Sequence, residues 1–261
     1  MNYLEQNRDS WNRGVMSRSV WAQPVDATTI AAAREGRWSV VLTPAKPVPR
    51  DWFGDVRGKD VLCLASGGGQ QVPVLAAAGA KVTSFDLSDE QLRKDQEVAS
   101  REGLSIRCVR GNMADLSALD DASFDLVFHP ASNSYAREVR PVWRECHRVL
   151  RPAGALLAGF MNPAVFLFDH DEADKSGELV VRHSLPFSEE SLPADKLAAK
   201  VGAGEPLGFS HSLADQIGGQ LEAGFLLAGL YEDHWFDDSW VFSNHSPVCI
   251  ATRALKLPVA Q

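Results

Sequence analysis

The sequence predicts an α/β protein built on a doubly wound, mostly parallel sheet. From residue 59 onward, short apolar runs alternate with helical segments, an order typical of strands joined by right-handed helical crossovers. The first run, 61–65, is continuously apolar, as expected for a strand that is buried on both faces. The predicted strands are 61–65, 81–86, 106–109, 124–129, 154–161, 225–231 and 248–253.

The helices between these strands have recognisable ends. The helix after the first strand starts near Gln70, and Gly79 ends it. The next helix begins at Ser88, which forms a capping-box pattern with Gln91. The predicted helices are 70–78, 88–103, 139–150 and 211–223.

Two segments do not follow this alternation. Residues 1–58 are rich in tryptophan and proline, and we expect them to form an N-terminal cap of short helices and loops. Their tryptophans could pack in the core or cover a ligand. Residues 59–261 form the main domain. Within it, 162–208 carries charge, proline and one strand-like stretch at 179–183, and we interpret it as an insertion over the edge of the sheet where ligands bind.

Composition excludes several functional classes. The formal net charge of −8 disfavours nucleic acid and anionic membranes as partners, because phosphate neutralisation needs a surplus of Lys and Arg. The four cysteines form no Cys-x-x-Cys pair, so neither a zinc ribbon nor a disulfide framework is indicated. The run 169–172 combines Asp, His and Glu, but adjacent residues rarely converge on one ion. We therefore predict no metal site.

The chain shows no targeting signal. Residues 1–11 lack the apolar core of a signal peptide, and the apolar stretch 154–168 is interrupted by Asn162 and Pro163. We expect a cytoplasmic protein, and the sequence leaves its oligomeric state open.

Ligands of doubly wound sheets bind beyond the carboxyl ends of the strands, where the strand order reverses. The loop after the first strand contains three consecutive glycines, which permit a tight turn and close approach of a ligand. The following helix can offer its free N–H groups to a carboxylate or phosphate. A sharp turn alone would also explain the glycines. The candidate binding residues in this loop are Ala65, Ser66, Gly67, Gly69, Gln70 and Gln71.

Two further loops reach the same edge. Asp86 ends the second strand, where a carboxylate can accept hydrogen bonds from both hydroxyls of a ribose. A helix-capping role is the alternative for Asp86, although Ser88 already occupies the cap. After the third strand, Asn112 can accept from an adenine amino group, and Met113 can offer its N–H and cover the purine face. Asn112 could equally be a turn residue.

These stretches together resemble the class I S-adenosylmethionine-dependent methyltransferases. The resemblance is to the small-molecule type that shares the ubiquinone/menaquinone-biosynthesis-like domain, and it covers roughly residues 55–255. It implies S-adenosylmethionine as cofactor and a seven-stranded, Rossmann-like sheet with a late antiparallel strand at 248–253. The stretches that carry it are 61–69, 85–86, 111–116, 123–127, 143–154 and 221–225.

The resemblance also implies roles for the loops. The glycine loop would bind the methionine end, Asp86 the ribose, and Asn112 with Met113 the adenine. Leu87 and Ala114 adjoin these residues and are counted among the cofactor-binding positions.

The sequence departs from the family pattern in the first strand, in the loop that follows it and in the loop after the third strand. Cys63 stands where the family usually has an acidic residue, and 65–67 reads Ala-Ser-Gly rather than Gly-Cys-Gly. Asn112 replaces the more frequent aspartate.

Methyl transfer from a sulfonium is an in-line displacement, so the protein mainly aligns the reactants and excludes water. A dedicated base is optional. The candidates for a base are His129, His183 and His211. Only His129 is placed by the strand pattern, after the fourth strand, where the family positions groups near the sulfonium. It is therefore the candidate catalytic residue and a further cofactor-binding candidate, although it could simply be a polar residue that ends a strand.

Two other functions share parts of this pattern. An NAD-dependent oxidoreductase would also need a ribose carboxylate, but no third glycine completes Gly-x-Gly-x-x-Gly here. A non-catalytic protein that senses S-adenosylmethionine or its product would explain the altered glycine loop. The favoured function is methyl transfer to a small-molecule acceptor whose reacting atom, oxygen, nitrogen or carbon, the fold does not determine.

Overall fold

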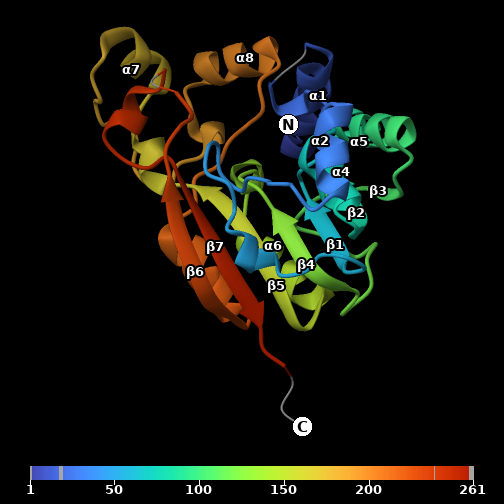
Figure 1. The fold of residues 1–261 in the computed structure, drawn as a ribbon. Helices are drawn as coiled ribbons and strands as arrows, with labels where there is room; N and C mark the ends of the chain where they lie inside the picture. Colours follow the sequence, from blue (N-terminus) through green and yellow to red (C-terminus); the bar gives the residue numbers. More distant parts are fainter. Residues whose placement is uncertain (1, 18–19, 238, 259–261) are drawn as a thin grey trace.

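A computed structural model describes residues 2–17, 20–237 and 239–258 of the chain, and a mixed sheet runs through its centre (Figure 1). The strands are β1 (Asp60–Leu64), β2 (Lys81–Asp86), β3 (Ile106–Arg110), β4 (Phe124–His129), β5 (Leu150–Met161), β6 (Phe225–Asp233) and β7 (Cys249–Lys256). Their order is β3-β2-β1-β4-β5-β7-β6. Strand β7 runs antiparallel to β5 and β6, while the other paired strands are parallel. This confirms the predicted seven-stranded sheet and its late antiparallel strand.

The first strand forms the middle of the core. Its residues alternate between the two faces of the sheet, and each face is buried. Val61 and Cys63 pack into a cluster with residues of the N-terminal segment. Leu62 and Leu64 pack into a second cluster around Trp143. Because β1 lies between β2 and β4, the strand order reverses beside it, and this places the expected ligand site at its carboxyl end.

The helices lie on both faces of the sheet and around its carboxyl edge (Figure 1). They are α1 (Tyr3–Met16), α2 (Ala27–Arg34), α3 (Arg50–Phe53), α4 (Gln71–Ala77), α5 (Asp89–Glu102), α6 (Arg140–Val149), α7 (His170–Ser176), α8 (Ala194–Ala203) and α9 (Gly219–Glu222). The predicted helix at 211–223 is only partly correct. A π-helical turn over Ala214–Gly218 precedes α9, so the regular helix is much shorter.

Helix α5 begins as predicted, but only half of the capping box forms. The hydroxyl of Ser88 accepts the backbone N–H of Gln91 at 3.1 Å. The reciprocal bond is absent, because the N–H of Ser88 donates to Asp86 Oδ1 at 2.9 Å. The side chain of Gln91 instead lies against the glycine loop. Its Oε1 would lie 2.6 Å from a Cβ added to Gly68.

The insertion at 162–208 carries α7 and α8, which lie at the carboxyl end of the parallel strands (Figure 1). The strand-like stretch at 179–183 does not form a strand. Only Val181 pairs, in an isolated antiparallel bridge with Phe168, and its side chain is 63% exposed. A β-branched run without a neighbouring strand or a buried face does not extend into a ladder.

The N-terminal segment packs directly on the sheet. Ile30, Leu42 and Phe53 are buried in the same cluster as Val61. The division of the chain into a cap at 1–58 and a main domain stays a prediction. The apolar side chains of the N-terminal segment complete one face of the core.

Residues 41–46 form an irregular strap across the carboxyl ends of the strands, and several hydrogen bonds hold it. Gln71 Oε1 accepts the N–H of the first strap residue. The carbonyl of Leu42 accepts from Ala131 N at 2.8 Å. The carboxylate of Asp233, through Oδ2, accepts the last two N–H groups at 2.9 and 2.8 Å. The strap is thus fixed to β4, β6 and α4 together.

The strap fits against β5 only because residue 159 is glycine. A Cβ on Gly159 would overlap the carbonyl oxygen of Leu42. We expect Gly159→Ala to lower the free energy of unfolding by about 1–3 kcal/mol, because the backbone of the strap must move. Urea unfolding measures this loss.

Gly202→Ala is the matched control. Gly202 lies in α8 and has no neighbour within 4 Å of an added Cβ. The control should gain about 0.5–1 kcal/mol from helix propensity. Equal stability of the two variants would show that the strap does not depend on close contact with β5.

Candidate active site

A cavity of about 350 Å³ lies at the carboxyl ends of β1, β2 and β3, where the three predicted loops meet. The strap and α1 contribute to its other walls. The predicted cofactor-binding residues that line it are Ala65, Ser66, Gly67, Gln70, Gln71, Asp86, Leu87, Asn112 and Met113. Most of the cofactor-binding residues predicted from the sequence therefore lie around one cavity.

The glycine loop after β1 adopts backbone angles that require glycine. Gly68 has φ of +119° and Gly69 has φ of +76°, a region that other residues rarely adopt. A Cβ on Gly68 would also meet Gln91 Oε1 and the carbonyl of Trp21. The loop is consequently packed between α5 and the N-terminal segment, with Gly67 facing the cavity.

Asp86 joins the first two loops. Its Oδ2 accepts the N–H of Gly67 at 3.1 Å, and its Oδ1 accepts the N–H of Ser88 at 2.9 Å. Each carboxylate oxygen keeps a further lone pair for a ligand. Desolvation by burial raises the pKa of Asp86 to about 6, so the group is mostly ionised at neutral pH. Among the described lining residues, Asp86 is the one carboxylate, and no Lys, Arg or His lines the cavity.

Asn112 serves as a turn residue and also lines the cavity. Its Oδ1 accepts the N–H of Ala114 at 3.1 Å, which leaves one lone pair of that oxygen and the amide N–H groups. Asn112 thus acts as a turn residue and still has a free acceptor for an adenine amino group, so the two roles expected from the sequence are compatible. Met113 lies beside it at the cavity wall.

Comparisons with known proteins agree with this geometry. A methyltransferase-domain family model matches residues 62–158. The chain is 46% identical over 259 residues to a Bacillus subtilis protein named uncharacterized methyltransferase YbaJ, with 98% of this chain and 100% of that protein covered. The chain belongs to the S-adenosylmethionine-dependent methyltransferases. Family membership makes it an enzyme.

More distant relatives share parts of the methyltransferase. A ubiquinone biosynthesis O-methyltransferase of Xanthomonas oryzae pv. oryzae is 27% identical over 178 residues, which cover 64% of this chain and 74% of that protein. The crystal structure of an S-adenosylmethionine-dependent methyltransferase from Mesorhizobium loti has a TM-score of 0.63 at 17% identity, with 79% of this chain and 94% of that chain covered. The structural likeness establishes the fold.

The residues of the methyltransferase cavity fit the cofactor that its family uses. Asp86 presents free lone pairs, and two buried polar atoms in the cavity wall, Ser66 Oγ and Gln91 Oε1, have no hydrogen-bond partner. A buried polar group without a partner costs about 1–3 kcal/mol. Both atoms are almost fully covered by protein, so a ligand in the cavity bonds first to the open lone pairs of Asp86.

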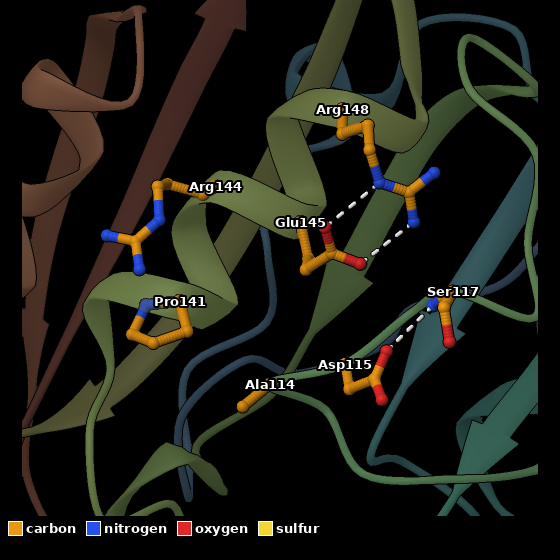
Figure 2. A pocket seen from close by; sticks show the side chains of 7 residues that line it. All are labelled: Ala114, Asp115, Ser117, Pro141, Arg144, Glu145 and Arg148. Carbon is orange, nitrogen blue, oxygen red and sulfur yellow. Dashed lines mark hydrogen bonds and ion pairs between the residues drawn. The ribbon is translucent and has the colours of Figure 1, made fainter.

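Three predicted cofactor-binding residues lie outside the cavity, and two of them, Gly69 and Ala114, belong to the loops that surround it. Gly69 instead donates its N–H to Asp95 and packs near Pro24 and Val98. Ala114 lines a second hollow of about 530 Å³ on the outer side of α6 (Figure 2). Both support the loops rather than face the cavity.

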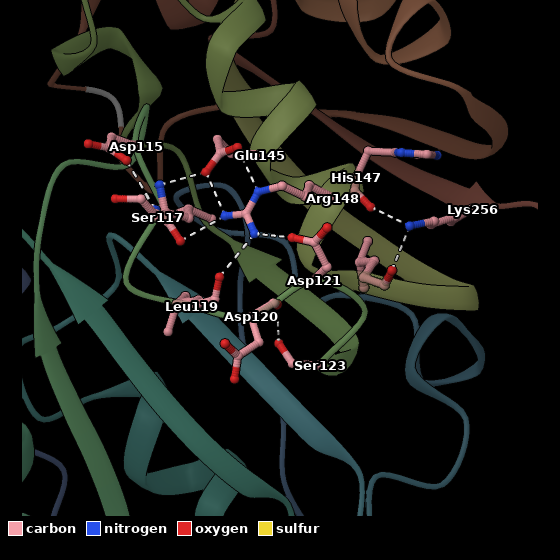
Figure 3. Close-up of polar contacts among 12 residues, drawn as sticks. Asp115, Ser117, Leu119, Asp120, Asp121, Ser123, Glu145, His147, Arg148 and Lys256 are labelled. Carbon is pink, nitrogen blue, oxygen red and sulfur yellow. Dashed lines mark hydrogen bonds and ion pairs between the residues drawn. The ribbon is translucent and has the colours of Figure 1, made fainter.

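The second hollow is built around an ion-pair network (Figures 2 and 3). Arg148 donates to both oxygens of Glu145 at 2.9 and 2.8 Å and to Asp121 at 2.6 Å. It also donates to the carbonyls of Leu116 and Leu119 at 2.8 and 3.0 Å. Its guanidinium thereby ties α6 to the loop that follows β3, which gives this residue of the 143–154 stretch a structural role.

His129 does not line the cavity. Its side chain is fully buried, and its ring lies 6.0 Å from that of Trp143 on the α6 side of the sheet. Nδ1 donates to the carbonyl of Leu64 at 2.9 Å, and burial lowers the pKa of His129 to about 4. The imidazole is therefore neutral, and His129 is not among the described residues that line the cavity, so its roles in catalysis and cofactor binding stay predictions.

The other two histidine candidates also lie elsewhere. His211 is buried against the carbonyl of Asn133, and the ring of His183 stacks on Phe187. Neither is among the described residues that line the cavity. In the described part of the chain, no group of three or more His, Cys, Asp or Glu residues is arranged to hold a metal ion. No described helix is long and apolar enough to cross a bilayer.

The sequence pattern missed Asp95, a fully buried carboxylate behind the glycine loop. Its Oδ1 accepts the N–H of Gly69 at 2.8 Å, and its Oδ2 accepts the hydroxyl of Ser84 at 2.7 Å. It thus ties α5 to the loop and to β2. The signal was available, because Gln91, Asp95 and Val98 share one face of α5 at helical spacing, and an acidic residue on a buried face needs specific partners.

Burial raises the pKa of Asp95 to about 7, above the usual range of an aspartate. The folded state therefore binds more protons than the unfolded state between the two pKa values, and its stability falls as the pH rises through this window. We expect the wild type to lose more unfolding free energy than Asp95→Asn between about pH 5 and pH 8, by roughly 2 kcal/mol.

Denaturant unfolding across this pH range makes the comparison. Ser84→Ala is the control, because it removes one hydrogen bond from Asp95 but retains the carboxyl group. Its stability should fall with rising pH at least as much as that of the wild type, because the hydroxyl of Ser84 lowers the pKa of Asp95 and its loss raises that pKa further. Parallel curves for the wild type and Asp95→Asn would contradict a buried titrating carboxyl at this position.

Proposed function

We propose that this methyltransferase transfers a methyl group from S-adenosylmethionine to a small-molecule acceptor by in-line displacement. The observation that carries the proposal is the convergence of the glycine loop, Asp86 and the 112–113 turn on one cavity of about 350 Å³. These loops follow three successive parallel strands, as the cofactor site of such a sheet requires.

Asp86 holds the ribose in this proposal. Its two oxygens each have one lone pair engaged by Gly67 or Ser88, so each can accept one ribose hydroxyl. Because the carboxyl is ionised above a pKa of about 6, it acts purely as an acceptor at neutral pH. The backbone N–H groups that it accepts fix its orientation before the ligand binds.

The loops on either side hold the two ends of the cofactor. Ser66, Gly67 and Gln70 would hold the methionine end, since all three line the cavity. Leu87 and the 112–113 turn would hold the adenine, and the remaining lone pair of Asn112 Oδ1 would accept from its amino group. Gln71 contributes indirectly, since its amide oxygen holds the strap.

The bound cofactor supplies an activated methyl group on a positively charged sulfur. The chain aligns the acceptor with that methyl group and keeps water away, which the strap and the tryptophans around the cavity accomplish. No imidazole or amine side chain is present among the described lining residues, so the mechanism assigns no proton transfer to the protein. A proton on the acceptor atom is released to bulk water when the methylated product leaves the cavity.

The enclosure of the site favours a small acceptor. A volume of about 350 Å³ lies near the lower end of the range for small-molecule pockets. Residues from α1 and the strap cover the cavity, and the net charge of −8 opposes a nucleic acid substrate.

Asp86→Ala tests the cofactor assignment. We expect it to weaken binding of S-adenosylhomocysteine, the reaction product, by about tenfold or more, which is about 1.4 kcal/mol. Titration calorimetry measures the affinity. Asp89→Ala is the matched control, because that carboxylate is exposed on α5 and pairs with Arg110 instead of facing the cavity.

An unchanged affinity of Asp86→Ala would refute the ribose assignment. Catalysis itself is tested by incubating the wild type with labelled S-adenosylmethionine and a panel of small hydroxy, amino and thiol compounds, followed by mass spectrometry of the products. Tight cofactor binding without transfer to any compound would favour the sensor function instead.

A further inference from the structure

The cavity has a second half that the proposed cofactor contacts do not use. We call it the acceptor half. It lies beyond the ends of β4 and β5 and against the connection between β6 and β7, beside the cofactor loops. Its lining residues are Trp21, Pro44, Ala131, Met161, Trp235 and Trp240.

Three tryptophans, one from the N-terminal segment and two from the connection between β6 and β7, form one wall of this half. The rings of Trp235 and Trp240 meet at 5.1 Å with an interplanar angle of 80°. The ring of Trp21 lies 5.9 Å from that of Trp235 at 65°. These are edge-to-face contacts, which hold aromatic rings in defined orientations.

The wall is anchored from behind by the insertion. The indole Nε1 of Trp240 donates to His170 Nδ1 at 2.7 Å. The opposite nitrogen of His170, Nε2, donates to the carbonyl of Val165 at 2.8 Å. This arrangement uses the neutral imidazole, and burial lowers the pKa of His170 accordingly. The polar atom of Trp240 is therefore satisfied outside the cavity, which leaves its apolar surface to the ligand.

Charge is distributed unequally between the two halves. Asp86 lies among the cofactor loops, whereas none of the acceptor-half residues carries a charge. A cationic acceptor would be repelled by the nearby sulfonium without a local carboxylate to offset it. An anionic acceptor would lose its hydration without a Lys or Arg to replace it. The lack of charged side chains in the acceptor half therefore disfavours both cationic and anionic acceptors.

We infer that the acceptor half binds an uncharged aromatic molecule, which stacks against Trp235 and Trp240 and lies beside Met161. Flat rings pack well on an edge-to-face tryptophan wall, and the thioether of Met161 adds a further favourable contact with an aromatic ring. This inference rests on the proposed function, since it takes the neighbouring half to be filled by the cofactor.

Three probes of similar shape test the charge requirement: 1-naphthol, 1-naphthoate and 1-naphthylmethylammonium. Each is titrated by calorimetry at neutral pH into protein saturated with S-adenosylhomocysteine. We expect 1-naphthol to bind about tenfold more tightly than either charged probe. The affinity for S-adenosylhomocysteine is measured first in every sample.

Variants of the wall test its location. Trp235→Leu should weaken 1-naphthol binding by about tenfold while the affinity for S-adenosylhomocysteine stays within about twofold. Met161→Lys should shift the preference toward 1-naphthoate, because it places a cation in the acceptor half. Trp38→Leu is the matched control, since Trp38 packs on Arg50 and Phe53 away from the cavity and should leave probe binding unchanged.

The outcomes separate this inference from the proposed function. If the wild type does not bind S-adenosylhomocysteine, the proposed function fails. If it binds S-adenosylhomocysteine but binds a charged probe as tightly as 1-naphthol, or binds none of the three, the acceptor inference alone is overturned. Tighter binding of the ammonium probe would identify the wall as an aromatic cage for cations and would also overturn it.

Discussion

The active site depends on one carboxylate that joins two loops. Asp86 accepts N–H groups from Gly67 and Ser88, and so connects the turn after β1 to the turn after β2. The same two oxygens face the cavity. Holding an ionised group in this partly desolvated place is unfavourable, and its raised pKa reflects that cost. Backbone donors and the hydroxyls of a ligand offset the cost together, which links loop geometry to cofactor binding.

Buried polar contacts support this arrangement from two sides. Asp95 fixes the far end of the glycine loop through Gly69, and Asp233 fixes the strap that covers the cavity. Each contact joins residues far apart in sequence, so the site forms only when the sheet is complete. Strand β1 carries Cys63 at the position where the resemblance implies an acidic residue, and a carboxylate from α5 contacts the glycine loop that follows.

The sheet could be predicted because its signals are local. Buried strands, helix ends and the glycine turn are each visible within about ten residues, and the order of β strands follows from crossover rules. Asp86 and the 112–113 turn were placed correctly at the cavity for the same reason, since the ends of parallel strands meet at one edge.

Other features depended on contacts that no local pattern contains. His129 does end β4, but its side chain points to the face of Trp143 and not to the cavity, a choice that depends on which face of the strand the residue occupies. The sequence placed the strap only within a tryptophan- and proline-rich cap of short helices and loops, whereas its position depends on Asp233, far along the chain. Trp235 and Trp240 lie in an irregular connection whose path only the folded protein reveals.

Contacts that the sequence pattern did not include also explain where its predictions failed. The 179–183 stretch has strand-like residues but no partner strand beyond a single bridge. Gln91 matched a capping box, yet Asp86 already accepts the N–H that its side chain would have bonded. In the first case the stretch lacks a partner strand. In the second, the side chain of Asp86 accepts the N–H that the capping box would have used.

A crystal structure with S-adenosylhomocysteine bound would test the central claim most directly. The account requires the ribose hydroxyls to lie within hydrogen-bonding distance of Asp86, with the adenine at the 112–113 turn and the amino-acid end at the glycine loop. Electron density for the ligand that left the carboxylate of Asp86 without a contact, or that placed the adenosyl group outside these three loops, would contradict it.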